Sequence, residues 1–173
     1  EHWLSTPEVL QRFALHYQTG KPIPQALVDK ITRSKTFNQG FATVEYLSAA
    51  LVDMKLHLAG DRKIDPDAFE RETLAQLGMP KEIVMRHRLP HFLHVFSSDG
   101  YSAGYYSYLW AEVLSADAFE AFEEAGVLDR ATGERFRKEV LAVGATRPAL
   151  ESFKAFRGRE PRPDALLKSY GLA

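Results

Sequence analysis

The sequence predicts an all-α fold, built as one module of about seven to nine helices. Apolar residues recur at helical spacing along nearly the whole chain, and no segment shows the sustained alternation of a strand between turn residues. Glycines and prolines stand where the helical patterns stop. At 173 residues, with 45% hydrophobic and 26% charged residues, the chain is long enough to bury a core.

The first two predicted helices begin at prolines, whose missing N–H is not needed in a first turn. One begins at Thr6-Pro7, with a hydroxyl at the N-cap, and ends at Gly20. The other begins at Pro24, and its core face is predicted to hold Leu27 and Ile31, with Val28 as a third candidate.

A longer helix is predicted from about residue 37 to residue 59, where apolar residues cover more than one side, as is typical of a buried helix. The next begins at Asp65-Pro66, with acids in its first turn, and ends at Gly78. A short helix should follow at 81–87.

Pro90 and the polar loop at 97–100 interrupt the helical pattern, which resumes at Tyr101. The tyrosine segment should continue as a helix to about Leu114. The remaining apolar spacing predicts four more helices, at about 118–126, 129–143, 148–156 and 163–170.

Composition excludes several classes of partner. A formal net charge of −1 provides no basic surface for nucleic acid or an anionic membrane. The chain has no cysteine, so it has neither disulfides nor a thiolate metal site. No apolar run reaches the roughly 20 residues of a membrane helix. We expect a cytoplasmic protein with no nucleic-acid or membrane partner.

The segment from His94 to Trp110 is the part of the chain best suited to chemistry. Its pliant loop precedes four of the seven tyrosines. On a continuous helix Tyr101 and Tyr108 lie on one face, where neutral phenols could donate hydrogen bonds to a developing oxyanion. Packing of an aromatic helix is the alternative interpretation. We assign the neighbouring residues mainly to packing: Tyr105, Tyr106, Leu109 and Trp110.

Three other groups of polar residues could have a function. His87, His91 and His94 would share a face of an unbroken helix and could bind a transition metal, but Pro90 argues against that helix. Four arginines could bind a carboxylate or simply be solvated, and the sequence selects none of them: Arg147, Arg157, Arg159 and Arg162. Three residues on one side of the long helix are interpreted as buried polar structure: Glu45, Asp53 and His57.

Residues 94–110 resemble the His…Gly-Tyr-x-Ala-x-Tyr-Tyr-x-Tyr-Leu-Trp segment of the thimet oligopeptidase and peptidyl-dipeptidase family of zinc metallopeptidases. The bacterial branch, of peptidyl-dipeptidase (Dcp) or oligopeptidase A type, is the closer match. Other segments also resemble the family: 37–46, 115–119, 132–137 and 156–161. Glu1-His2-Trp3 resembles the end of its Glu-x-Pro-Ser-Gln element.

This resemblance implies that residues 1–173 are the C-terminal helical part of a peptidase catalytic domain. None of the six histidines begins His-Glu-x-x-His, so the chain lacks the zinc-binding segment of the family. The parent enzyme is expected to use zinc and to cleave short peptides, as a peptidyl-dipeptidase or an oligopeptidase. This chain is expected to hold no metal, to have the N-terminal remainder of the parent as its partner, and to be inactive in isolation.

The resemblance also implies roles for single residues. Tyr108 and Tyr101 match the substrate-facing tyrosines of the family and are expected to be catalytic. Tyr108 should donate to the oxyanion of the tetrahedral intermediate, and Tyr101 should hold the peptide backbone. His94 and Gly100, with both tyrosines, are expected to bind substrate.

A second hypothesis comes from a different class. The chain could be a non-catalytic all-α module that binds peptides or a protein partner in its groove. The coding sequence upstream of Glu1 discriminates between the two: a His-Glu-x-x-His there favours the enzyme, and an adjacent start codon favours the module.

Overall fold

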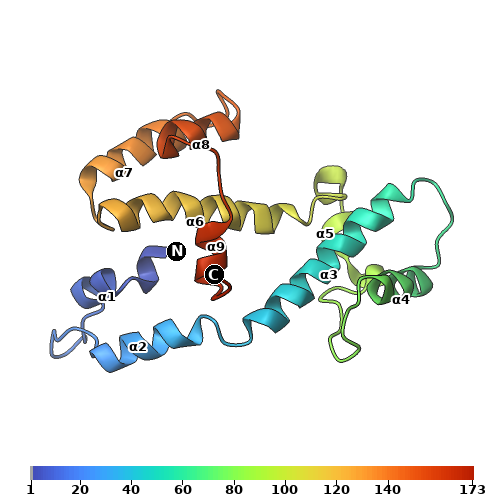
Figure 1. Ribbon diagram of the computed structural model, residues 1–173, viewed down its shortest axis with the longest axis horizontal. Coiled ribbons are helices and arrows are strands. Elements are labelled where there is room, and N and C mark those ends of the chain that lie inside the picture. Colours follow the sequence, from blue (N-terminus) through green and yellow to red (C-terminus); the bar gives the residue numbers. More distant parts are fainter. Residues whose placement is uncertain (1) are drawn as a thin grey trace. The chain divides into compact units, whose positions relative to one another are not determined.

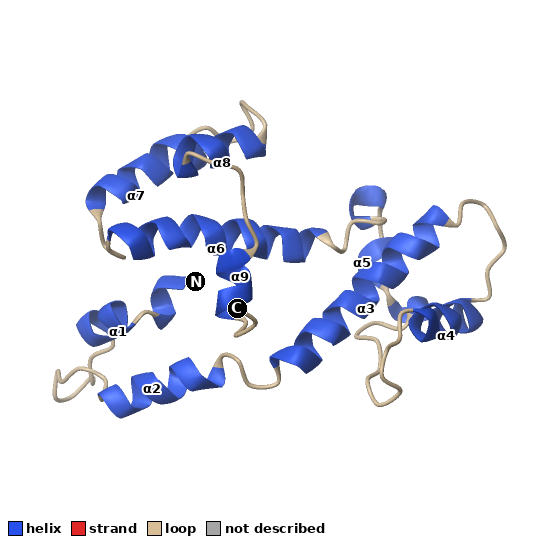
Figure 2. Ribbon diagram, viewed as in Figure 1, coloured by secondary structure: helices blue, strands red, loops and turns tan. Residues whose placement is uncertain are grey.

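The computed structural model describes residues 2–173, and over this range the chain is helical, with no β-strand (Figure 2). The one bridge of extended backbone in the described range joins Leu15 and Pro22. The all-α prediction is therefore confirmed. Glu1, the first residue of the Glu-His-Trp resemblance, lies outside the described range. No described helix combines the length and the apolar character that crossing a bilayer requires.

Figure 1 labels the α-helices in chain order. Their bounds are α1 Pro7–Phe13, α2 Gln25–Ser34, α3 Gln39–Leu58, α4 Pro66–Gln76, α5 Leu93–Phe96, α6 Ser107–Ala125, α7 Arg130–Phe136, α8 Ala149–Arg157 and α9 Asp164–Ser169. Shorter 3₁₀ turns lie at His2–Ser5, Leu89–His91 and Asp99–Tyr101, and a π-helical turn at Arg137–Leu141 extends α7.

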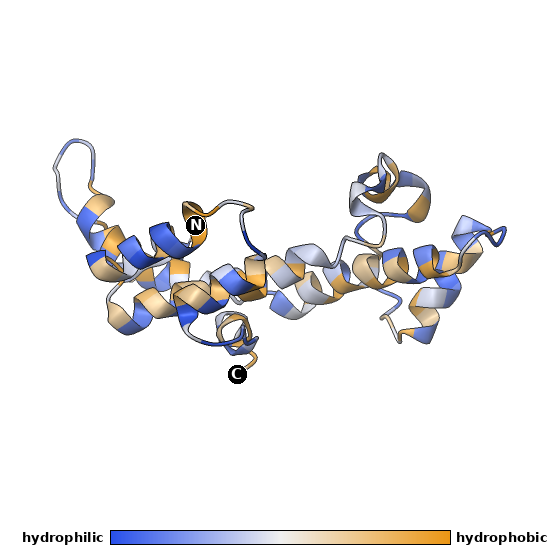
Figure 3. Ribbon diagram, turned by 90° about the horizontal axis from the view of Figure 1, so that it is seen from above, coloured by the Kyte–Doolittle hydropathy of each residue, from blue (hydrophilic) through white to orange (hydrophobic). Residues whose placement is uncertain are grey.

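Several helices start at the residues that their capping chemistry favours. The side chain of Asp65 accepts a 2.8 Å hydrogen bond from the amide of Ala68 at the start of α4. Asp129 accepts a 2.7 Å bond from the amide of Thr132 in the same way at α7. Every helix carries both apolar and polar residues (Figure 3).

The chain divides into two compact units. The internal unit is Asn38–Trp110, and the terminal unit combines the residues up to Phe37 with Ala111–Ala173. One boundary falls just before α3 and the other falls inside α6. The first boundary lies in the polar turn between α2 and α3, whereas the second interrupts a continuous helix and has no mark in the composition.

The internal unit packs its core around α3. Small residues of α3, Ala49 and Ala50, let neighbouring side chains approach its backbone closely. The buried cluster of this unit is Ala49, Ala50, Val52, Met85, Leu89, Phe92, Val95 and Tyr105. The long central helix predicted at 37–59 is thus confirmed, with α3 ending one residue earlier.

The short helix predicted at 81–87 does not form, and these residues run as turns and irregular backbone. The buried carboxylate of Glu70 accepts a 2.9 Å bond from the amide of Leu89 and contacts Nε of Arg88 at 2.5 Å. These contacts anchor the connection to α4. Pro90 follows Leu89 and disfavours helical backbone before it.

The terminal unit has an aromatic core. Its buried cluster is Phe119, Ala121 and Phe122 of α6 with Phe156 of α8, and Trp3, Phe136 and Val140 pack against it. The ring of Trp3 meets those of Phe119 and Phe122 edge-on, each at 4.8 Å between centroids. Its Nε1 donates a 2.7 Å bond to the carbonyl of Val127.

Two predictions in the first 37 residues are wrong in detail. Helix α1 ends at Phe13 rather than near Gly20, because Ala14 accepts a 2.9 Å backbone bond from Ile23 and the chain turns back. In α2 the buried residue is Val28, whereas Leu27 and Ile31 are exposed. Part of the apolar face of α2 is therefore not covered by the described residues.

Candidate functional site

The side chains of His94, Tyr101, Tyr105 and Tyr108, here called the phenol cluster, lie together in the internal unit. Nε2 of His94 lies 2.8 Å from the hydroxyl oxygen of Tyr108. The rings of Tyr101 and Tyr108 stack, with centroids 5.7 Å apart and planes 4° apart. The ring of His94 meets that of Tyr101 edge-on at 4.8 Å. The structure thus brings together three of the four residues predicted to contact substrate.

The phenol cluster is open to solvent on one side. Tyr101 is 40% exposed and Tyr108 38% exposed, and His94 is also exposed. Tyr105 is buried, and its ring meets Phe92 edge-on at 5.0 Å. The predicted packing role of Tyr105 is confirmed, and the two outer tyrosines are not sealed inside the core.

The tyrosines do not meet as the sequence predicted, because Tyr101 is not part of α6. Tyr101 ends the 3₁₀ turn Asp99–Tyr101, and α6 begins at Ser107 and continues unbroken to Ala125. Between them, Ala103 adopts φ of +55°, and the amide of Gly104 donates a 2.8 Å bond to the carbonyl of Tyr101. A turn, rather than a continuous helical face, stacks the two rings.

Gly100 lies at the start of that turn. Its amide lies 3.4 Å from the hydroxyl of Ser98, the N-cap of the 3₁₀ turn. Gly104 has the greater steric demand, since a Cβ built there would lie 3.2 Å from the carbonyl oxygen of Tyr101. The loop therefore depends on Gly104 for its conformation.

Two residues of α3 hold this region and were not predicted to do so. The hydroxyl of Tyr46 donates to the carbonyl of Tyr105 (2.6 Å) and accepts from the amide of Leu109 (3.1 Å). Asp53 is buried, as predicted for buried polar structure, and it accepts hydrogen bonds from the amides of Ala103 and Tyr105. In the sequence, the only sign of this role was that Asp53 is an ionisable residue among the apolar residues of α3.

Electrostatics keep the outer phenol neutral. Hydrogen bonding with Tyr101, followed by partial desolvation, raises the pKa of Tyr108 to about 12. A phenol with this pKa stays protonated at physiological pH, so it remains able to donate a hydrogen bond. Burial, with the nearby positive charge of Arg86, lowers the pKa of His87.

The three histidines considered as metal ligands have other surroundings. His87 stacks on Phe92 with centroids 4.9 Å apart, while His94 contacts the tyrosines. The 3₁₀ turn Leu89–His91 replaces the continuous helix that a shared face would need. Within residues 2–173, no group of three or more His, Cys, Asp or Glu side chains is arranged to hold a metal ion.

Three of the four arginines are paired with carboxylates inside the terminal unit. Arg157 and Arg159 both contact the buried Asp117, at 3.0 and 2.6 Å, and Arg147 contacts Glu139 at 2.8 Å. Burial opposes ionisation of Asp117, but hydrogen bonds from Arg159, from the Arg162 amide and from Arg157 outweigh it and lower its pKa. The side chain of Arg157 is only 6% exposed, so a solvated surface role does not apply to it.

Other aromatic residues of the tyrosine segment depart from the predicted packing. Tyr106 is 53% exposed and Trp110 is 52% exposed, whereas Leu109 is partly buried.

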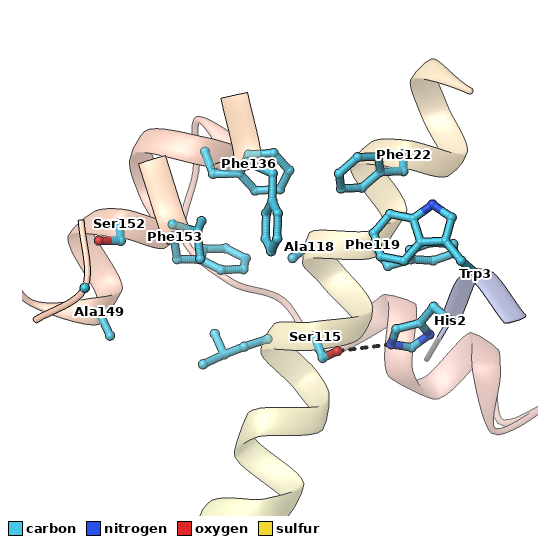
Figure 4. A pocket seen from close by; sticks show the side chains of 14 residues that line it. His2, Trp3, Ser115, Ala118, Phe119, Phe122, Phe136, Ala149, Ser152 and Phe153 are labelled. Atoms are coloured by element: carbon cyan, nitrogen blue, oxygen red, sulfur yellow. Dashed lines mark hydrogen bonds between the residues drawn. The ribbon is translucent and has the colours of Figure 1, made fainter. Parts of the chain in front are cut away.

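The terminal unit contains an apolar pocket of about 420 Å³ that sequence analysis did not find (Figure 4). Six aromatic residues line it: Trp3, Phe119, Phe122, Phe136, Phe153 and Phe156. Its polar edge includes His2, whose Nε2 lies 3.1 Å from the hydroxyl of Ser115. The pocket is suited to binding an apolar group rather than to acid–base chemistry.

Comparison with known proteins matches residues 1–172 to Peptidase family M3. The chain is 42% identical over 176 residues to Oligopeptidase A of Escherichia coli (strain K12), covering 99% of this chain and 25% of that protein. It is 41% identical over 179 residues to a probable cytosolic oligopeptidase A of Arabidopsis thaliana, covering 99% and 25%.

It is also 38% identical over 176 residues to Dipeptidyl carboxypeptidase of Salmonella typhimurium (strain LT2), covering 99% of this chain and 26% of that protein. The chain therefore spans about a quarter of the length of the curated relatives it matches. With a family match over residues 1–172 and relatives at this identity, the chain belongs to Peptidase family M3.

Proposed function

We propose that this chain is the C-terminal part of the catalytic domain of a longer peptidase that cleaves short peptides. Within it, the phenol cluster contacts the substrate at the bond to be cleaved. Membership of Peptidase family M3 and the names of the relatives support the class of reaction. The geometry of His94, Tyr101 and Tyr108 supports the proposal that the substrate binds at the phenol cluster.

The observation that carries the proposal is the 2.8 Å contact between Nε2 of His94 and the hydroxyl of Tyr108, on an exposed edge. If Nε2 carries the ring proton, His94 donates to Tyr108, and the phenol does not give its own proton to His94. That proton would then be donated to the oxyanion formed when the peptide carbonyl is attacked. Tyr101, stacked beside it, would hold the adjacent peptide backbone, and Gly100 would belong to the loop over the substrate.

The zinc expected from the family resemblance has no place among the described residues. No group of potential ligands in residues 2–173 is arranged to hold it. We propose that zinc is bound by the remainder of the parent, outside this chain, and that the chain alone is inactive. The residues described here would bind and orient the peptide.

We further propose that the remainder of the parent covers apolar side chains that the chain leaves exposed. Those with the largest exposed fractions are Tyr17, Phe37, Leu58 and Leu4. The relatives are about four times as long as this chain, so a large partner surface would be available in the parent. A cytoplasmic location is proposed on the description of one relative as cytosolic.

Substitution of Tyr108 by phenylalanine in the full-length protein tests the proposed function. Loss of one oxyanion donor should lower kcat by roughly 10²- to 10³-fold with little change in KM. Tyr106→Phe is the matched control, since that exposed tyrosine lies outside the phenol cluster, and it should leave both constants unchanged. A kcat for Tyr108→Phe equal to that of the control would refute the oxyanion role.

The non-catalytic module remains the second candidate, and the aromatic pocket of the terminal unit is the observation that favours it. If these residues form a binding module, the full-length protein that contains them should bind peptides but not hydrolyse them. Hydrolysis of a short peptide by that protein, measured by mass spectrometry of the products, would exclude the module.

A further inference from the structure

Asp53 lies within α3 and is 0% exposed. A buried carboxylate is destabilising unless donors replace the water around it. Here the donors are the amide of Ala103 (3.1 Å to Oδ1) and the amide of Tyr105 (3.0 Å to Oδ2), while Nδ1 of His57 lies 2.9 Å from Oδ1. Both donors belong to the backbone of one turn, so the carboxylate binds that turn.

This turn, residues 101–106, has a conformation that its own sequence does not favour. Ala103 has φ of +55°, a region that residues other than glycine seldom adopt. Next to it, Gly104 packs so closely on Tyr101 that a side chain would press on the carbonyl oxygen. An acceptor outside the turn, receiving the amides on both sides of Gly104, stabilises this arrangement against the alternatives.

The conformation of the turn decides where the phenols lie. Tyr101 precedes it and Tyr108 follows it, so a different path between them would separate their stacked rings. It would also move Tyr108 relative to His94, which reaches the cluster from α5. The side chain of Asp53 itself faces the amides from inside the core, not the exposed edge of the cluster.

We propose that Asp53 is a positioning residue: by accepting the amides of Ala103 and Tyr105, it holds Tyr101 and Tyr108 against His94 in the geometry that peptide cleavage requires. This inference rests on the proposed function of the phenol cluster. It assigns to α3 a part in the reaction that no contact with substrate would reveal.

Asp53→Asn in the full-length protein is the direct test, because it keeps the shape of the side chain and changes its hydrogen bonding. One carboxylate oxygen becomes an NH₂ group, which would face a backbone N–H without an acceptor between them. We expect the turn to shift and kcat to fall about 10- to 100-fold, since a misplacement of about 1 Å can lower turnover 10²-fold.

A double-mutant comparison separates positioning from a general loss of stability. In a Tyr101→Phe/Tyr108→Phe background the hydroxyl contributions of both tyrosines are already absent, so Asp53→Asn should lower kcat by less than about threefold. Purely structural damage would lower kcat by the same factor in both backgrounds. Equal factors, or an Asp53→Asn enzyme with unchanged kcat, would overturn the proposal.

Glu70→Gln provides a matched control, because Glu70 is also buried in the internal unit and also accepts a backbone amide, that of Leu89. It lies outside the phenol cluster, so the factor by which Glu70→Gln changes kcat per folded molecule should be the same in the two backgrounds. If Asp53→Asn does not fold, Asp53→Glu, which keeps the charge but moves the oxygens, goes through the same pair of backgrounds with the same expected and overturning results.

The test also distinguishes failure of this inference from failure of the proposed function. Unchanged kcat in both Tyr108→Phe and Tyr101→Phe would remove the catalytic role of the cluster and, with it, the role of Asp53. A large loss in Tyr108→Phe beside unchanged kcat in Asp53→Asn would leave the cluster in place and overturn positioning by Asp53 alone.

Discussion

The two units each contain a buried aspartate, and the two carboxylates have different partners. Asp53 in the internal unit binds two backbone amides and a histidine. Asp117 in the terminal unit binds the guanidinium groups of Arg157 and Arg159 and the amide of Arg162. Neutral amides position a turn beside an exposed cluster, whereas the arginines neutralise the charge of Asp117 within the fold. The first arrangement should matter most for turnover and the second for stability.

The largest effect on stability is expected for Asp117→Ala. Removing this carboxylate leaves the guanidinium of Arg157, which is 6% exposed, without its buried counter-ion. We expect the free energy of unfolding to fall by about 3–5 kcal/mol. Urea denaturation of the full-length protein, followed by tryptophan fluorescence, measures it.

Glu124→Gln is the control for that measurement. Glu124 also contacts Arg157, at 3.1 Å, but its side chain is 59% exposed. Its removal should change the free energy of unfolding by less than about 1 kcal/mol. Similar losses in the two variants would show that burial does not set the difference between the carboxylates.

The titration of Tyr108 tests the comparison between the two units at a residue of the internal unit. The contact with Tyr101 raises the pKa of Tyr108 from 10.0 to about 12, so the folded protein should keep this phenol protonated through the range in which ordinary tyrosines ionise. Phenolate absorbance recorded against pH for the wild type and for Tyr108→Phe should therefore differ only in the late part of the titration. A difference centred near pH 10 would contradict the raised pKa.

The smallest effect is expected for Trp3→Phe in the terminal unit. This change removes the 2.7 Å hydrogen bond from the indole to Val127 but keeps an aromatic ring against Phe119 and Phe122. We expect a loss of about 1 kcal/mol in the free energy of unfolding. Trp110→Phe, at a position 52% exposed, should be close to neutral, and a larger loss there than at Trp3 would contradict this ranking.

Local signals predicted much of the fold. The start of α4 at Asp65-Pro66 and that of α7 after Asp129 follow capping chemistry within a few residues of sequence. The helix predicted at 81–87 does not form, and the two residues that follow it, Arg88 and Leu89, are held by a contact with Glu70 that is distant in sequence. Capping can be read from neighbours, but such a contact cannot.

The sequence predicted which residues lie together in the candidate site, but not how the backbone brings them together. The resemblance identified His94, Tyr101 and Tyr108, and the structure brings their side chains together. Helical spacing gave the wrong reason, because the chain between the two tyrosines turns at Ala103 and Gly104. The partner that stabilises this turn lies 50 residues earlier in the sequence, at Asp53, where no local pattern connects it to the tyrosines.

The hydrogen bonds of Tyr46 have a practical consequence for protein engineering. The first turn of α6 receives a cap from this hydroxyl of α3, which accepts the amide of Leu109 and donates to the carbonyl of Tyr105. The tyrosine segment is therefore not a portable motif. Residues 94–110 grafted onto another scaffold should not keep the geometry of the phenol cluster unless residues that replace Tyr46 and Asp53 are grafted with them.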